Sequence, residues 1–161
     1  MADFYKRAAN IGVVASTQSS HAVGDSGWAE ERLGAARIKH AYAWQKMLAA
    51  GIPLAINSDL PGEPWHPMQT LYFAVTRSTL DGAPAEGWYK QKALSSSQAL
   101  TAMTITNAYA AFQDPYIGSI EVGKLADFVI LDKDPLLTEE TELKSIEVLQ
   151  TWVSGSPVWS K

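Results

Sequence analysis

The sequence predicts an α/β fold followed by a small β appendage. Two short apolar runs, Ile11–Ala15 and Pro53–Ile56, flank a stretch, Trp28–Ala50, whose apolar residues recur at helical spacing. A strand–helix–strand unit needs a crossover, so we expect these two strands to be parallel. From Gly118 onward, short apolar runs separated by Gly and Pro indicate antiparallel strands. We therefore expect an α/β part over residues 1–112 and a β part over residues 113–161.

The α/β part is expected to open with a short helix, Ala2–Asn10, before the first strand. Thr17–Gly27 is polar and glycine-containing, which indicates a loop. Gly51 follows the long helical stretch as a C′ glycine, and Pro67 is placed to begin a helix over Met68–Arg77.

The remaining elements follow from turn and capping residues. Gly82, Pro84 and Gly87 make residues 78–92 irregular, and Ser96 is placed to N-cap a helix that runs to about Phe112. Residues 118–131 are typical of two short strands about a Gly123–Lys124 turn. Residues 146–153 and 158–159 are expected to form a hairpin around residues 154–157.

Composition excludes several functional classes. The chain has 161 residues, 47% hydrophobic and 19% charged, with a net charge of −4, which is typical of a globular protein. Its Lys and Arg residues form no stripe, so we expect no nucleic-acid partner. No apolar run is long enough for a membrane span and the first residues have no signal-peptide core, so a cytoplasmic location is expected. Without Cys there is no thiolate metal site.

Three stretches in this order carry a family resemblance, and a supporting piece, Thr104–Ala108, lies between the second and the third. They are Gly12–Gln18 with His21, Asp25, Trp28 and Arg32–Gly34; Asn57-Ser-Asp-Leu-Pro61; and Gly118–Asp132 with Asp134-Pro135. Together they resemble the amidohydrolase superfamily, specifically its third family, which includes N-substituted formamide deformylase-like enzymes. The resemblance covers essentially the whole chain.

The resemblance implies a (β/α)₈ (TIM) barrel that carries a β-sandwich built from both chain ends. Ile11–Ala15 would be barrel strand 7 and Pro53–Ile56 strand 8. Residues 113–161 would form the C-terminal half of the sandwich. The chain would then be a C-terminal fragment that lacks strands 1 to 6, and with them the family's metal-binding histidines.

Asp59 is the catalytic candidate, because it follows a strand and catalytic groups of such barrels lie at the C-terminal strand ends. The matching aspartate of the family binds the metal and handles the proton of the attacking water. A divalent metal brings the pKa of bound water toward neutrality, and a neighbouring carboxylate can accept the proton. The structural alternative is an Asp that only shapes a Ser-Asp-x-Pro turn.

His21, His66 and Trp65 are the candidate substrate-binding residues. His21 is expected in the loop after the first strand, facing substrate, although a solvated loop His explains it equally well. His66 precedes Pro67 near Asp59, where an ordinary loop role is the alternative. Glu63 and Trp65 lie beyond Asp59, where they either line a pocket rim or are bystanders.

These expectations lead to three hypotheses of function. The first is a fragment of a metal-dependent hydrolase that cleaves a non-peptide carbon–nitrogen bond of a small amide through metal-activated water. The second is a non-catalytic module that associates with itself, and the third is one half of a split hydrolase. In each case Asp59 alone holds no divalent ion tightly, so zinc or another metal is expected only with the missing ligands, and the isolated chain is expected to be inactive. Two barrel strands with unpaired edges also predict a homo-oligomer or strand-sharing dimer.

Overall fold

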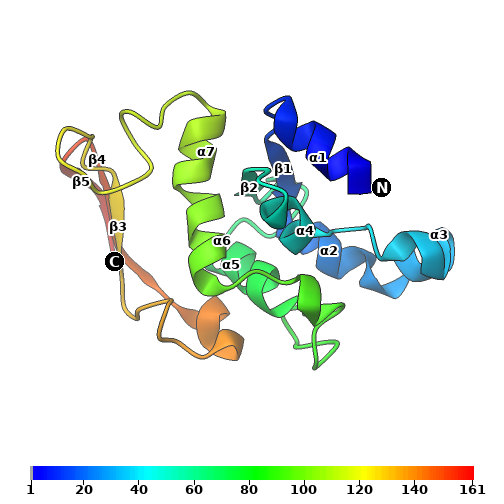
Figure 1. Ribbon diagram of the computed structural model, residues 1–161. Coiled ribbons are helices and arrows are strands. Elements are labelled where there is room, and N and C mark those ends of the chain that lie inside the picture. Colours follow the sequence, from blue (N-terminus) through cyan, green and yellow to red (C-terminus); the bar gives the residue numbers. More distant parts are fainter. Residues whose placement is uncertain (1) are drawn as a thin grey trace.

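The computed structural model describes residues 2–161 and contains short helices around a two-stranded sheet, with a separate three-stranded sheet at one end (Figure 1). In chain order the helices are α1 (Ala2–Asn10), α2 (Ser19–Gly24), α3 (Ala29–Ile38), α4 (Trp44–Ala49), α5 (Pro67–Thr76), α6 (Ser96–Met103) and α7 (Ile105–Ala110). Single 3-10 turns are η1 (Asp25–Gly27), η2 (Lys90–Lys92) and η3 (Glu140–Ser145). The strands are β1 (Ala15–Gln18), β2 (Leu54–Asn57), β3 (Phe128–Leu131), β4 (Val148–Val153) and β5 (Ser156–Ser160). No helix in this described range is both long and apolar enough to cross a membrane.

Strands β1 and β2 are parallel, as predicted, with Ala15 opposite Leu54 and Gln18 opposite Asn57. The first strand, however, begins at Ala15 and not at Ile11, whose side chain is 79% exposed. Gly12 explains the difference. It adopts a left-handed φ of 73° directly after α1, and the amide of Val13 donates to the carbonyl of Ala8, so this segment completes a helix C-terminus.

The expected long helix over Trp28–Ala50 is wrong, because the segment forms α3 and α4 with a turn between them. Gly34 has φ 73° inside α3 and Tyr42 has φ 47° in the turn, and neither value is helical. The expected loop over Thr17–Gly27 is also wrong, since it contains the last two residues of β1 and the whole of α2. Gly51, with φ 79°, ends α4 as predicted.

Helix α5 is the centre of the main core. Pro67 begins it as predicted, and eight of its side chains, from Met68 to Thr76, are buried. Against it pack β2, α2 and α6, together with Leu143 and Ile146 from the η3 region. The core of the α/β part therefore includes side chains that follow residue 112.

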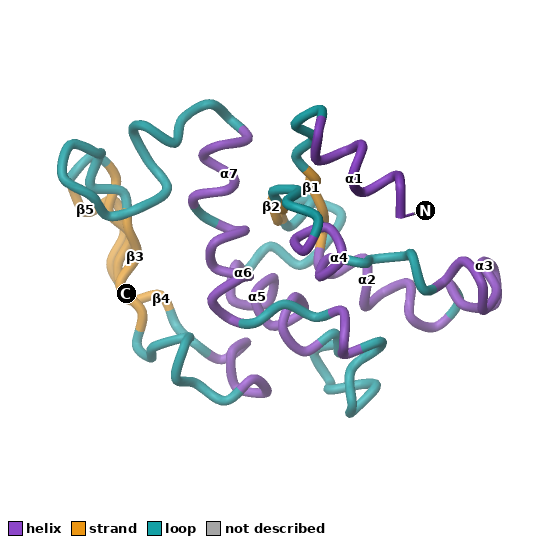
Figure 2. Tube along the Cα trace, in the orientation of Figure 1, coloured by secondary structure: helices purple, strands orange, loops and turns teal. Residues whose placement is uncertain are grey.

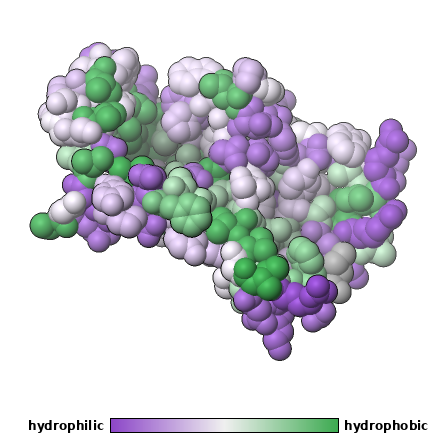
Figure 3. Space-filling model, turned by 90° about the horizontal axis from the view of Figure 1, so that it is seen from above, coloured by the Kyte–Doolittle hydropathy of each residue, from purple (hydrophilic) through white to green (hydrophobic). Residues whose placement is uncertain are grey.

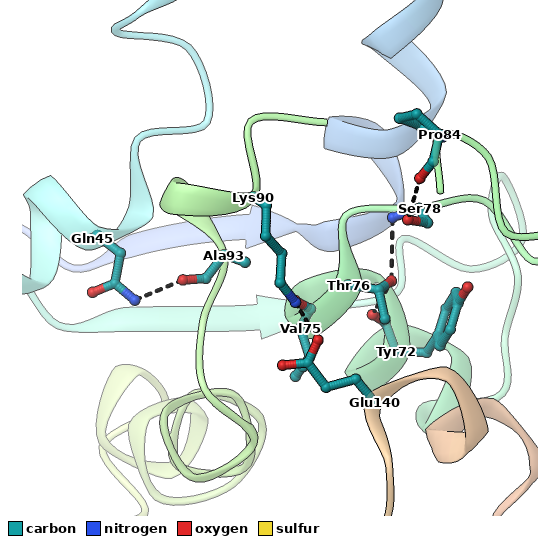
Figure 4. A network of polar contacts seen from close by, with 9 residues as sticks. All are labelled: Gln45, Tyr72, Val75, Thr76, Ser78, Pro84, Lys90, Ala93 and Glu140. Atoms are coloured by element: carbon teal, nitrogen blue, oxygen red, sulfur yellow. Dashed lines mark hydrogen bonds and ion pairs between the residues drawn. The ribbon is translucent and has the colours of Figure 1, made fainter. Parts of the chain in front are cut away.

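A polar network around α5 links distant segments (Figure 4). The ammonium group of Lys90 donates to the carbonyl of Val75 at 2.8 Å and pairs with Glu140 of η3. Gln45 of α4 donates to the carbonyl of Ala93 at 2.7 Å. The segment between α5 and α6 is thus joined to both α4 and η3.

The last part of the chain forms an antiparallel sheet in the order β3–β4–β5 (Figure 2). The hairpin of β4 and β5 turns at Ser154–Gly155, near the predicted position. Only one strand, β3, lies between residues 118 and 131, where two were expected. The sheet lies on the far side of α6 and α7 from β1 and β2 (Figure 1). Figure 3 shows hydrophobic surface in several patches on the face seen from above. The exposed large hydrophobic side chains of the chain include Phe4, Ile11, Val122 and Trp159.

Candidate active site

The C-terminal ends of β1 and β2 are joined by polar side chains. The amide of Gln18 donates to Asn57 Oδ1 at 3.1 Å, and Asn57 Nδ2 donates to Ser16 Oγ at 3.1 Å. Asn57 Oδ1 also accepts from the main-chain N–H of Asp59 at 3.1 Å, an Asx turn that holds Asp59 just beyond the strand. Asp59 has a left-handed φ of 59°, a conformation that Asp tolerates better than most residues.

Two of the predicted residues, His21 and Asp59, meet at this edge. His21 lies on α2, which begins directly after β1 and not in a loop, and its Nε2 is 3.5 Å from Asp59 Oδ2. The same Nε2 is 3.3 Å from Glu63 Oε1. The side chains of His21, Asp59 and Glu63 are 37%, 57% and 29% exposed, so the cluster is open to solvent. An imidazole between two carboxylates can accept, hold and release a proton.

The segment that carries His21 is held from its other end. The hydroxyl of Tyr42 donates to the carboxylate of Asp25, directly after α2. Burial raises the pKa of Tyr42, and the hydrogen bond to Asp25 raises it further, so the phenol stays protonated. Because Tyr42 belongs to the turn between α3 and α4, this bond fixes the position of α2 and therefore of His21.

The structure places Trp65 and His66 away from this cluster. His66 Nδ1 accepts from the main-chain N–H of Met68 at 3.3 Å, so it caps α5. With Val129 and Trp159 of the C-terminal sheet, Trp65 and His66 line a hollow of about 540 Å³ whose lining includes neither Asp59 nor His21. Both were predicted to contact substrate, and that role stays a prediction.

The sequence did not decide whether Glu63, the third member of the cluster, is part of the site. It lies in the irregular loop after β2, and nothing in its spacing from Asp59 indicates which way the loop turns. The sequence shows only that Glu63 lies four residues after Asp59, which places it near the strand end but not against His21.

The cluster does not form a metal site by itself. Within residues 2–161 no group of three or more His, Asp or Glu side chains is arranged to hold an ion. Asp59 is exposed and offers one carboxylate, whereas metal sites of this type need several N and O ligands. That tight metal binding through Asp59 needs ligands from outside this chain stays a prediction.

Known proteins resemble the chain over nearly its whole length. The family model described as "Amidohydrolase family" matches residues 3–159. The chain is 34% identical over 154 residues to Protein LONG AFTER FAR-RED 3 from Arabidopsis thaliana, covering 95% of this chain and 26% of that protein. It is 37% identical over 111 residues to the N-substituted formamide deformylase of Arthrobacter pascens, covering 69% of this chain and 20% of that enzyme.

Solved structures of related enzymes also resemble the chain. An uncharacterized metal-dependent hydrolase from Pyrococcus horikoshii OT3 superposes with a TM-score of 0.75 at 30% identity, covering 86% of this chain and 28% of that one. An adenosine deaminase from Xanthomonas campestris with bound zinc gives a TM-score of 0.52 at 28% identity, covering 70% and 27%. The chain thus spans only a fifth to about a quarter of the curated relatives described above. Since the family model spans all but a few terminal residues, the chain belongs to the amidohydrolase family.

Proposed function

We propose that this chain is the C-terminal portion of a metal-dependent hydrolase that cleaves a carbon–nitrogen bond other than a peptide bond. One observation carries the proposal: His21 and Asp59 lie 3.5 Å apart at the C-terminal ends of two adjoining parallel strands. That edge is where barrel enzymes place their reacting groups. In this proposal β1 and β2 are barrel strands 7 and 8, and β3–β5 are half of the accompanying sandwich.

The residues of this chain would supply proton handling. A divalent ion held mainly by the rest of the protein would supply electrophilic activation and an acidic bound water. Asp59, fixed by its Asx turn, accepts a proton and returns it to the leaving amine nitrogen. His21 binds and orients the substrate next to Asp59, and Glu63 helps to hold the imidazole through the same Nε2 that faces Asp59.

Complementation tests this function directly. The truncated partner would be the Arthrobacter pascens N-substituted formamide deformylase without the region that matches this chain. We expect the two chains, mixed with zinc, to release formate from N-substituted formamides, and Asp59→Asn to abolish the release. Each chain alone is expected to be inactive. Glu31→Gln, on exposed α3, is the matched carboxylate control and should keep activity.

The control for reassembly is the deformylase's own portion that matches this chain, supplied as a separate chain. If that portion restores activity and this chain does not, the non-catalytic module is favoured. If this chain hydrolyses the substrates alone, with stoichiometric metal, the need for outside ligands is wrong. Activity with any natural second chain would identify a split hydrolase.

We also propose that the isolated chain associates with itself through its open strand edges. Within the described residues β1 pairs only with β2, which leaves one edge of each strand unpaired. Phe4, Ile11 and Val13 line an apolar hollow of about 570 Å³ near the start of β1. Sedimentation velocity across a concentration series should give dimers or larger species, and a stable monomer at all concentrations would contradict this.

A further inference from the structure

A second, smaller pocket lies between α4 and the 3-10 helix η2. Its volume is about 200 Å³, and its lining includes Lys39, Lys46, Lys92, Gln91 and Tyr89. None of its lining residues belongs to the His21–Asp59–Glu63 cluster. Figure 4 shows Gln45 of α4, another lining residue, bonded to Ala93 just beyond η2, so the two walls are tied together.

The three lysines of the pocket have no carboxylate partner. Within residues 2–161, ion pairs are made by Lys90, Lys124, Lys133 and Lys161, but not by Lys39, Lys46 or Lys92. Burial lowers the pKa of Lys92 and the negative charge of Glu30 offsets part of this shift, but the Glu30 carboxylate accepts a hydrogen bond from the Tyr89 hydroxyl at 3.1 Å. In a chain of net charge −4, three lysines that line one pocket and make no ion pair within residues 2–161 are a local excess of positive charge.

Lys92 is the fixed member of the group. Only 7% of it is exposed, and its ammonium group donates to the carbonyls of Ile38 at 2.9 Å and Ala41 at 3.0 Å. It also lies 4.2 Å from the centre of the Tyr89 ring. These contacts give Lys92 a structural role in joining η2 to the end of α3, so its charge is held at the pocket.

Lys39 and Lys46 are the adaptable members. Both are exposed, and the one contact of the Lys46 ammonium group is a long one, 3.4 Å from the carbonyl of Lys39. Their donors are therefore free to reorganise around a ligand. The positive charge of these lysines also acts on the neighbouring His40. Burial lowers the pKa of His40, and the charges of Lys46 and Lys39 lower it further.

We propose that this pocket binds a small, multiply charged oxyanion of the phosphate class between Lys39 and Lys46, with the Gln91 amide as an additional donor and Lys92 beneath. Lysine ammonium groups are common phosphate ligands, acting as point charges. The volume is smaller than the roughly 300–1,000 Å³ of pockets that enclose drug-sized ligands, so inorganic phosphate or a small phosphate monoester fits and a nucleotide does not. The ligand offsets a positive charge that the protein leaves unpaired.

The test is titration of the whole chain with inorganic phosphate at constant ionic strength, followed by ¹⁵N-resolved NMR. We expect saturable shifts confined to the amides around Lys39–Lys46 and Tyr89–Lys92. The double variant Lys39→Gln/Lys46→Gln changes only exposed side chains and should weaken binding by at least about tenfold. The control Lys6→Gln/Lys133→Gln removes the same charge elsewhere and should bind within about twofold of the original chain.

Three results would overturn the proposal. The first is an absence of saturation beyond the effect of sodium chloride. The second is an equal loss of affinity in both double variants, which would mean that phosphate senses only net charge. The third is tighter binding of citrate than of phosphate, which would assign the pocket to carboxylates.

Discussion

The side-chain amide of Asn107 donates a hydrogen bond to the main-chain carbonyl of Ile56 at 2.8 Å. The same nitrogen lies 3.1 Å from the carbonyl of Met103, one turn earlier on the helical segment. Helix α7 is thereby attached to β2, three residues before Asp59. The Thr104–Ala108 stretch, which supports the family resemblance, thus acts by holding the strand that carries the candidate catalytic residue.

Asn107→Ala should lower the free energy of unfolding by about 1–2 kcal/mol, because the carbonyl of Ile56 loses its partner in a partly buried position. Urea denaturation followed by tryptophan fluorescence measures the change. Gln113→Ala removes an exposed amide nearby and should change stability by less than about 0.5 kcal/mol. Equal effects of the two substitutions would show that the Asn107 bond does not stabilise the sheet.

The sequence predicted the elements whose boundaries are set by a single local residue. Pro67 at a helix N-terminus and Gly51 at a helix C-terminus were both placed correctly, because their backbone preferences are intrinsic. Gly12 and Gly34 were instead placed inside a predicted strand and a predicted helix, because each lies within a longer apolar pattern. A left-handed glycine interrupts such a pattern without changing its hydrophobicity.

The sequence predicted individual residues of the candidate site, but not the contacts between them. His21 and Asp59 were each singled out because each follows a strand, and the parallel pairing of β1 with β2 brings them to one edge. That Glu63 approaches the same imidazole depends on the path of an irregular loop. Long-range packing of that loop has no periodic signal in the sequence.

Gly118→Ala should destabilise the protein by about 2–4 kcal/mol, since an added Cβ meets both strain and crowding. Gly118 has φ 93°, and the new Cβ would lie 2.7 Å from Ala108 Cβ and 3.0 Å from Ile105 Cα. Gly123→Ala separates the two causes, because Gly123 has φ 97° with nothing within 4 Å. It should cost about 1 kcal/mol in thermal or urea unfolding. If the two variants are equally stable, the close approach of residue 118 to α7 is not maintained in solution.

The N-cap of α6 is Ser95 and not the predicted Ser96. Replacing each serine in turn should therefore affect stability differently. Ser95 Oγ accepts from the N–H of Gln98 at 3.1 Å, and Gln98 Oε1 accepts from the N–H of Ser95 at 3.0 Å, a capping box. Ser95→Ala should lower stability by about 1 kcal/mol, and Ser96→Ala by much less. Chemical denaturation of both variants decides between the positions, and a larger loss at Ser96 would contradict the assigned cap.

Lys92 should make stability rise with pH above neutrality. Burial lowers its pKa from the ordinary 10.5 to about 8, and the nearby positive charges of Arg77 and Lys46 add to the shift. Between these two pH values the unfolded chain binds a proton that the folded chain has released. Raising the pH in this window therefore favours the folded state.

The measurement is urea denaturation at pH 7.5 and 9.5 for the original chain and for Lys92→Met. The original chain should gain about 1–2 kcal/mol over this interval relative to the variant, because other titrating groups are common to both. Loss of the two hydrogen bonds to Ile38 and Ala41 lowers the stability of Lys92→Met at both pH values and so cancels in the comparison. Parallel pH profiles for the two proteins would mean that the Lys92 ammonium group is as well solvated when folded as when unfolded. Lys6→Met, at an exposed position, should retain the pH dependence of the original chain, which assigns the effect to the buried lysine.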